Sequence, residues 1–174
     1  MTDNEFGRRD MAAAEGSAIT PTVFYRDPMA ALRWLERAFG FETSMLVTDE
    51  AGKVGHAEMT WRGAAIAVGG EFASPELIGP AQMKSPLSLG GAGSQFIRLH
   101  MDGDIDAHCE RARAAGARVT QAPADQFYGA RTYRALDPEG HVWNFQQAVS
   151  EISVAEMERA SGLRISTSLE KETP

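Results

Sequence analysis

Residues 125–145 read DQFYGARTYRALDPEGHVWNF and carry the clearest structural signal in the chain. The segment Asp137-Pro138-Glu139-Gly140 is a turn sequence, because proline presets φ early in a turn and glycine accepts the positive φ that closes it. Residues 132–136 and 142–145 are rich in β-branched and aromatic side chains, which favour strands. The stretch therefore predicts a loop, a strand, a tight turn and a second strand.

The order of elements that ends in this hairpin occurs twice. In the first half, Asp27-Pro28 predicts a helix start, with aspartate as N-cap and proline at the first helical position. Gly40 predicts its end. We expect strands over residues 19–25, 41–48, 56–61 and 64–68 around this helix. The second half predicts a strand over 96–101, a helix over 104–115, a strand over 118–121, a loop over 122–131 and a hairpin over 132–147.

The two halves match at an offset of 76 or 77 residues, which aligns Gly40 with Gly116 and Gly63 with Gly140. We therefore predict an α+β fold of two tandem βαβββ modules. Module one covers residues 18–70 and module two covers 95–148, and the Pro- and Gly-rich segment 71–94 links them. Residues 1–17 are predicted to be a flexible arm, and 149–174 a short helix over 154–161 followed by a tail.

Composition excludes several classes of protein. The net charge is −7, with no basic cluster, so a nucleic-acid partner is not expected. No apolar run approaches the roughly 20 residues that a membrane span needs. The N-terminus has no apolar signal-peptide core. Cys109 is the single cysteine and cannot form an intrachain disulfide, which favours a soluble protein of a reducing cytoplasm.

Three phrases resemble a known family. The segments YRDPMAALRWLERAFGFE, IDAHCERARAAGARV and DQFYGARTYRALDPEGHVWNF are similar to the glyoxalase, bleomycin-resistance and extradiol-dioxygenase group, the vicinal oxygen chelate superfamily. Within it they resemble the PhnB-like subgroup of small glyoxalase-like proteins. The resemblance covers about residues 18–148. It implies cupped mixed sheets that enclose a small-molecule pocket, within one chain or across a homodimer.

The resemblance also gives the positions of a possible metal site. The family's metal enzymes take two ligands from each module, one on its first strand and one on its last. Those positions hold Thr20, Ala67, Phe96 (Ile97 with a shift of one) and Asn144. These side chains are poor or impossible ligands for a first-row metal, so we expect no cofactor. The alternative is a divalent zinc, nickel, manganese or iron ion held by His56, Glu58, Glu71 and His100.

Alternation along the strands predicts which side chains line the cup. The predicted pocket residues are Thr22, Phe24, His56, Glu58, Arg98, His100, Phe127, Tyr128, Asn144 and Gln146. Phe127 and Tyr128 are predicted to form a lid or a dimer contact. This mixture suits a polar-edged aromatic or an anionic small molecule.

Three functions fit the sequence. The first is a metal-independent binding protein, and the second is a metal-dependent lyase or isomerase. The third is a metal-free enzyme with His100 or Glu58 as general base and Arg98 stabilising an anion.

Four other features are given structural roles. We expect His141 to hydrogen-bond locally within the hairpin. Cys109 is expected on a buried helix face. Trp34 and Trp61 are expected in the core or at an interface. Asp125 and Arg131 could pair across the base of the loop.

Overall fold

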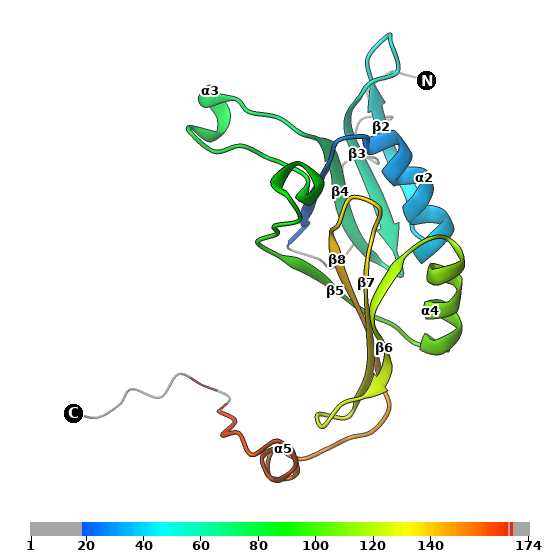
Figure 1. Ribbon diagram of the computed structural model, residues 1–174, viewed down its shortest axis with the longest axis vertical. Helices are drawn as coiled ribbons and strands as arrows, with labels where there is room; N and C mark the ends of the chain where they lie inside the picture. The colour runs from blue at the N-terminus through cyan, green and yellow to red at the C-terminus, as the bar shows by residue number, and fades with distance from the viewer. Residues whose placement is uncertain (1–18, 167, 169–174) are drawn as a thin grey trace, which may run out of the picture.

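Two four-stranded sheets, each with one helix on one face, form the body of the molecule (Figure 1). The coordinates are a computed structural model that describes residues 19–166 and Ser168, so the predicted arm over residues 1–17 lies outside the described residues. Module one contains β1 (Thr22–Tyr25), α2 (Pro28–Phe39), β2 (Glu42–Thr48), β3 (Val54–Trp61) and β4 (Ala64–Gly70). Module two contains β5 (Phe96–His100), α4 (Ile105–Ala114), β6 (Arg118–Asp125), β7 (Ala130–Leu136) and β8 (Val142–Ala148).

The two sheets have the same topology. Sheet one has the order β1-β4-β3-β2 and sheet two the order β5-β8-β7-β6. In each, the first strand pairs parallel with the last, and the other pairs are antiparallel. The predicted α+β fold of two tandem βαβββ modules is confirmed.

Helix α2 begins and ends where the sequence predicts. The Asp27 carboxylate accepts a hydrogen bond from the Ala30 N–H at 2.9 Å, and Pro28 occupies the first turn. Gly40 ends the helix in the left-handed region, with φ of 77°. A side chain there would be strained, so glycine is the residue that this helix end favours.

The prediction of a loop over residues 122–131 is wrong. Strand β6 continues to Asp125 and β7 begins at Ala130, so a turn of residues 126–129 joins them. Pro123 lies at the edge of the sheet, where its missing N–H breaks no ladder bond, and a register shift between Gln121 and Ala124 accommodates it. The first strand is also shorter than predicted, since it begins at Thr22.

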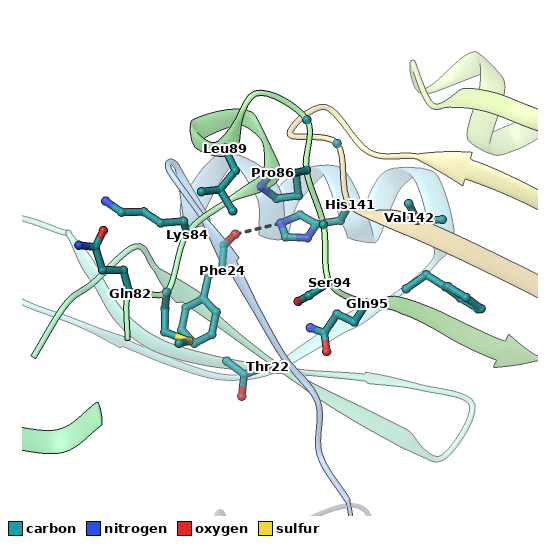
Figure 2. A pocket seen from close by; sticks show the side chains of 16 residues that line it. Thr22, Phe24, Gln82, Lys84, Pro86, Leu89, Ser94, Gln95, His141 and Val142 are labelled. Atoms are coloured by element: carbon teal, nitrogen blue, oxygen red, sulfur yellow. Dashed lines mark hydrogen bonds between the residues drawn. The ribbon is translucent and has the colours of Figure 1, made fainter. Parts of the chain in front are cut away.

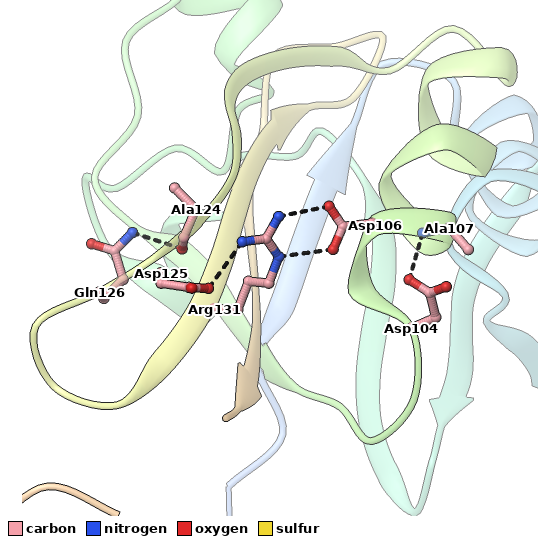
Figure 3. Close-up of polar contacts among 7 residues, drawn as sticks. All are labelled: Asp104, Asp106, Ala107, Ala124, Asp125, Gln126 and Arg131. Atoms are coloured by element: carbon pink, nitrogen blue, oxygen red, sulfur yellow. Dashed lines mark hydrogen bonds and ion pairs between the residues drawn. The ribbon is translucent and has the colours of Figure 1, made fainter. Parts of the chain in front are cut away.

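The predicted pairing of Asp125 with Arg131 is present at the base of this turn (Figure 3). Arg131 donates to the Asp125 carboxylate at 2.9 Å, and to both carboxylate oxygens of Asp106 on α4 at 2.8 Å. The hydrogen bonds that Arg131 donates to Asp106, and then to Asp125, raise the pKa of Arg131 above its ordinary value. The guanidinium therefore joins β6, β7 and α4.

One apolar core serves both modules. Helix α2 packs against α4, and both contribute to a single cluster of buried side chains that includes Leu35, Phe39 and Phe145. Trp34 and Trp61 are buried in it and donate to the backbone oxygens of Ala115 and Phe39, each at 2.8 Å. This core lies between the helices and the inner faces of the sheets, so the other face of each sheet, here called its outer face, points away from it.

Cys109 is fully buried on α4. Burial raises the pKa of its thiol, so the thiolate needed for nucleophilic chemistry is disfavoured. The expectation of a packing role fits this environment.

The Asp137 turn, residues 137–141, ties module two to module one. The buried Asp137 carboxylate accepts from the Tyr25 hydroxyl at 2.7 Å and from the Trp143 indole at 3.1 Å. Burial, and then the charge of Asp137, raise the pKa of Tyr25 well above its ordinary value, so the phenol keeps the proton that it donates. Glu139 accepts from the backbone N–H groups of Arg26 and Asp27 at 2.8 and 3.0 Å.

His141 forms a hydrogen bond within its hairpin, as predicted, but its side chain also contacts module one. Its Nε2 lies 2.9 Å from the backbone oxygen of Phe24 in β1, and its ring meets that of Tyr25 edge-on with centroids 4.6 Å apart. Its backbone N–H does bond locally, to Asp137 at 3.0 Å. The imidazole therefore helps to hold the two modules together.

The remaining elements lie outside the two sheets. The linker contains α3 (Pro75–Ile78) and the short 3-10 helix η1 (Pro86–Leu89). The predicted C-terminal helix is present as α5 (Val154–Ser161), capped by Ser153 and Glu156. It extends from the end of β8 and contacts no other described helix or strand (Figure 1). None of the helices among the described residues is long and apolar enough to span a membrane.

Candidate functional site

A pocket of about 770 Å³ lies where the two modules and the linker meet (Figure 2). Thr22 and Phe24 of β1 form its floor, and Phe96 and Val142 at the starts of β5 and β8 line another side. Linker residues Gln82, Met83, Lys84, Pro86, Leu89 and 91–94 line much of the rest, with Gln95, Gly140 and His141. The segment predicted as a linker therefore supplies much of the pocket wall.

The pocket combines aromatic rings with polar side chains. The ring of Phe24 lies against that of Phe72, with centroids 5.6 Å apart. Gly69 lies beneath Phe24, and a Cβ there would come within 3.4 Å of the ring. The glycine therefore lets the phenylalanine settle close to the sheet.

The linker wall is held by Glu71. Its carboxylate accepts from the Ser85 N–H at 2.9 Å and lies 3.7 Å from the Lys84 ammonium. Hydrogen bonds from Ser88, and then from Ser85, lower the pKa of Glu71. The carboxylate stays ionised and orders the segment that carries Lys84 into the pocket.

The structure brings two of the predicted pocket residues, Thr22 and Phe24, into this pocket. His56 and Glu58 lie on the outer face of sheet one, with His56 Nε2 and Glu58 Oε1 3.4 Å apart. Phe127 and Tyr128 lie in the turn between β6 and β7. That turn is at the opposite end of β7 from the pocket residues Gly140 and His141, so it does not cover this pocket.

The other predicted residues lie on the outer face of sheet two. Arg98 on β5 is opposite Asn144 on β8, which is opposite Arg134 on β7. In the next row, His100 is opposite Gln146. Asn144 is only 1% exposed, and its Oδ1 has no hydrogen-bond partner among the described residues. The sequence analysis placed Asn144 correctly in the sheet but missed Arg134.

The family's metal positions do not form a ligand set here. Thr20 precedes β1, and the strand register puts Thr22 opposite Ala67 and Arg98 opposite Asn144. The hydroxyl of Thr20, the methyl group of Ala67, the ring of Phe96 and the neutral amide of Asn144 do not suit a divalent metal. In the described part of the chain, no three His, Cys, Asp or Glu side chains gather in a group that could hold a metal ion. Of the alternative set, Glu71 is bonded within the linker and His100 lies on the other module.

Sequence reasoning missed four polar residues of the pocket wall, which are Gln82, Lys84, Ser94 and Gln95. Gly90 to Gly93 marked the segment as a loop, but a loop's composition does not show which side chains it turns inward. His108 was also missed. It is buried beneath α2, with Nδ1 2.6 Å from the Tyr133 hydroxyl and Nε2 3.1 Å from the Phe39 carbonyl oxygen.

The fold consists of two βαβββ modules, with a pocket where they meet the linker. The sequence profile of the Glyoxalase/Bleomycin resistance protein/Dioxygenase superfamily matches residues 18–145, and the chain belongs to this superfamily. An uncharacterized protein of Mycobacterium tuberculosis strain H37Rv is 31% identical over 151 residues, which are 86% of this chain and 85% of the relative.

Solved structures have the same fold. TioX from Micromonospora sp. ML1 is 29% identical, with a TM-score of 0.57 over 79% of this chain and 100% of that one. A glyoxalase/bleomycin resistance protein/dioxygenase from Nocardioides is 20% identical, with a TM-score of 0.56 over 86% of this chain and 95% of that one. At that identity the second likeness concerns the fold alone.

Proposed function

We propose that this protein binds a small polar-edged aromatic or anionic molecule without a metal. The pocket of about 770 Å³ carries the proposal, because its size suits a small ligand and its lining joins rings to scattered polar groups. Phe24 and Phe96 offer aromatic surface, and Lys84 offers a positive charge. The substitutions at the family's metal positions support the metal-free part of the proposal.

Binding is tested with a panel of aromatic acids and amides, followed by calorimetry. Phe24→Ala is expected to weaken binding about tenfold, through lost ring contact and apolar area. Phe127→Ala is the matched control, since Phe127 is partly exposed at the far end of sheet two. Equal affinity of the wild type and Phe24→Ala for every ligand found would reject the pocket as the binding site.

Metal analysis of the purified protein tests the alternative. A metal-dependent lyase or isomerase that uses His56, Glu58, Glu71 and His100 would retain stoichiometric zinc, nickel, manganese or iron. The His56–Glu58 pair is the part of that set that the structure brings together. We expect no stoichiometric metal, and no loss of ligand binding after treatment with a chelator.

The protein is also proposed to be a homodimer, in which the outer face of sheet one in one protomer faces that of sheet two in the other. Each face presents an exposed apolar side chain, Val47 on sheet one and Phe96 on sheet two. Apolar area that is uncovered in the single chain would be buried between the two faces. The PhnB-like subgroup and the cytoplasmic location stay predictions.

A further inference from the structure

A row of unpaired cations crosses the outer face of sheet two. The register places Arg98 and Arg134 on either side of Asn144, and Arg118 opposite Leu136 on the same face. All three arginines are exposed, and none forms an ion pair with the residues that the structure describes. Three like charges on one small sheet repel one another, so an anion bound among them would stabilise this face.

This face carries no carboxylate, although the chain as a whole has a net charge of −7. The other side chains at its strand positions are neutral or imidazole: Phe96, His100, Gln121, Ala124, Ala130, Thr132, Leu136, Val142, Asn144, Gln146 and Ala148. The local field is therefore positive on a protein whose overall charge is negative. Such a surface attracts anions.

Two buried amide oxygens lie among these cations. The Oδ1 of Asn144 and the Oε1 of Gln146 are buried without a hydrogen-bond partner in the described structure. A buried acceptor left unpaired destabilises the fold, so a ligand that supplies a donor here gains a hydrogen bond that the protein lacks by itself. The site therefore favours a ligand with both a negative charge and a donor.

The cation row meets the pocket at Phe96. The Arg98 guanidinium carbon lies 5.9 Å from the centroid of the Phe96 ring, and Phe96 also lines the pocket. Neighbouring strands lie about 4.8 Å apart, so the Arg98 and Arg134 backbones are about 10 Å apart and their side chains can reach one anion. A ligand whose aromatic ring lies in the pocket could therefore place an anionic substituent of that ring beside the arginines.

We propose that the ligand is an aromatic carboxylate with a hydroxyl or amine next to the carboxylate. The ring packs against Phe96, and the carboxylate accepts from Arg98 and Arg134, whose planar donors match its geometry. The neighbouring donor bonds to Asn144 Oδ1. This inference rests on the proposed function and narrows its ligand class.

The test uses salicylate and its neutral analogue salicylamide, titrated by calorimetry and by NMR of the side-chain amides. Salicylate is expected to bind about tenfold tighter than salicylamide, and to shift the Asn144 amide signal. Arg98→Gln and Arg134→Gln are each expected to weaken salicylate about tenfold and to leave salicylamide unchanged. Arg33→Gln, which removes the same charge from the exposed side of α2, should change the affinity for neither salicylate nor salicylamide.

Equal affinity for the two probes, or salicylate binding that neither arginine variant weakens, would overturn the anion site. The pocket would still stand if Phe24→Ala weakened both probes. Failure of both probes to bind also overturns this ligand class, whereas the proposed function falls only if Phe24→Ala affects no ligand of the wider panel.

Discussion

At the scale of single residues, buried polar groups connect the modules. Asp137 belongs to a turn motif common to many hairpins, yet its carboxylate bonds to Tyr25, 112 residues earlier in the chain. Its second oxygen accepts from the backbone N–H groups of Glu139 and His141, both at 3.0 Å. The same carboxylate therefore shapes the turn and attaches it to module one.

His108 makes the stability of the fold depend on pH. Burial lowers the pKa of its imidazole from 6.5 to about 4 in the folded protein. Above pH 6.5 both states are neutral at this site. Below it the unfolded state binds a proton that the folded state does not, so stability falls until about pH 4. The loss is at most about 3 kcal/mol.

Urea unfolding at a series of pH values measures this effect. His108→Gln keeps an amide that can bond to Phe39 and Tyr133 but cannot titrate. We expect its free energy of unfolding to vary less between pH 6.5 and about 4 than that of the wild type. His100→Gln, on an exposed position of β5, should keep the wild-type dependence. If the two variants had the same pH dependence, His108 would not be the source.

At the scale of elements, local chemistry predicted where α2 begins and ends but not how far β6 extends. Asp27, Pro28 and Gly40 act within a few residues of one another, so the sequence carries their whole signal. Whether 122–125 forms a strand depends on pairing with β7, and Pro123 argues locally against it. The contact of His141 with Phe24 spans 117 residues, which no local pattern encodes.

The prediction of the pocket residues is limited in the same way, because local pattern does not encode long-range packing. Alternation along the strands identified Thr22 and Phe24 because strand side chains point to alternate faces. It assigned Arg98, Asn144 and Gln146 to one face of one sheet, as the register confirms. It could not tell that the two outer faces point away from a shared core, because that depends on how α2 packs against α4.

The turn between β6 and β7 allows a test at this scale. Gly129 has φ of 80°, and a Cβ added there would overlap the backbone oxygen of Ser150. Gly129→Ala should destabilise the protein by about 3 kcal/mol, from left-handed strain plus displacement of the chain after β8. Gly52→Ala has a similar φ of 81° with no atom within 4 Å, and should cost about 1 kcal/mol.

Thermal and urea unfolding of the two glycine variants separate strain from overlap. If Gly129→Ala and Gly52→Ala lowered the free energy of unfolding equally, the segment around Ser150 would move away freely and would not secure the turn. A clear difference would show that this segment packs on module two, although α5 beyond it contacts no other described element.

At the scale of the whole molecule, the shared core leaves both outer faces uncovered. Val47 on β2 is 50% exposed and Phe96 on β5 is 49% exposed. Exposed apolar side chains on an open sheet suit a partner of the same kind. One chain cannot bring its own two faces together while α2 and α4 pack between the modules.

Val47→Lys tests the dimer that this arrangement predicts. Because Val47 is half exposed in the single chain, the substitution should change the free energy of unfolding of the monomer by no more than about 0.5 kcal/mol. In the dimer the new cation would be buried against the positively charged face of the partner's sheet two, and we expect self-association to weaken at least tenfold, which corresponds to about 1.4 kcal/mol or more. Light scattering across a range of concentrations measures the effect, with Leu163→Lys, beyond α5, as the control. A wild-type protein that stays monomeric at every concentration would refute the dimer, and the ligand would then have to bind to a pocket formed by one chain.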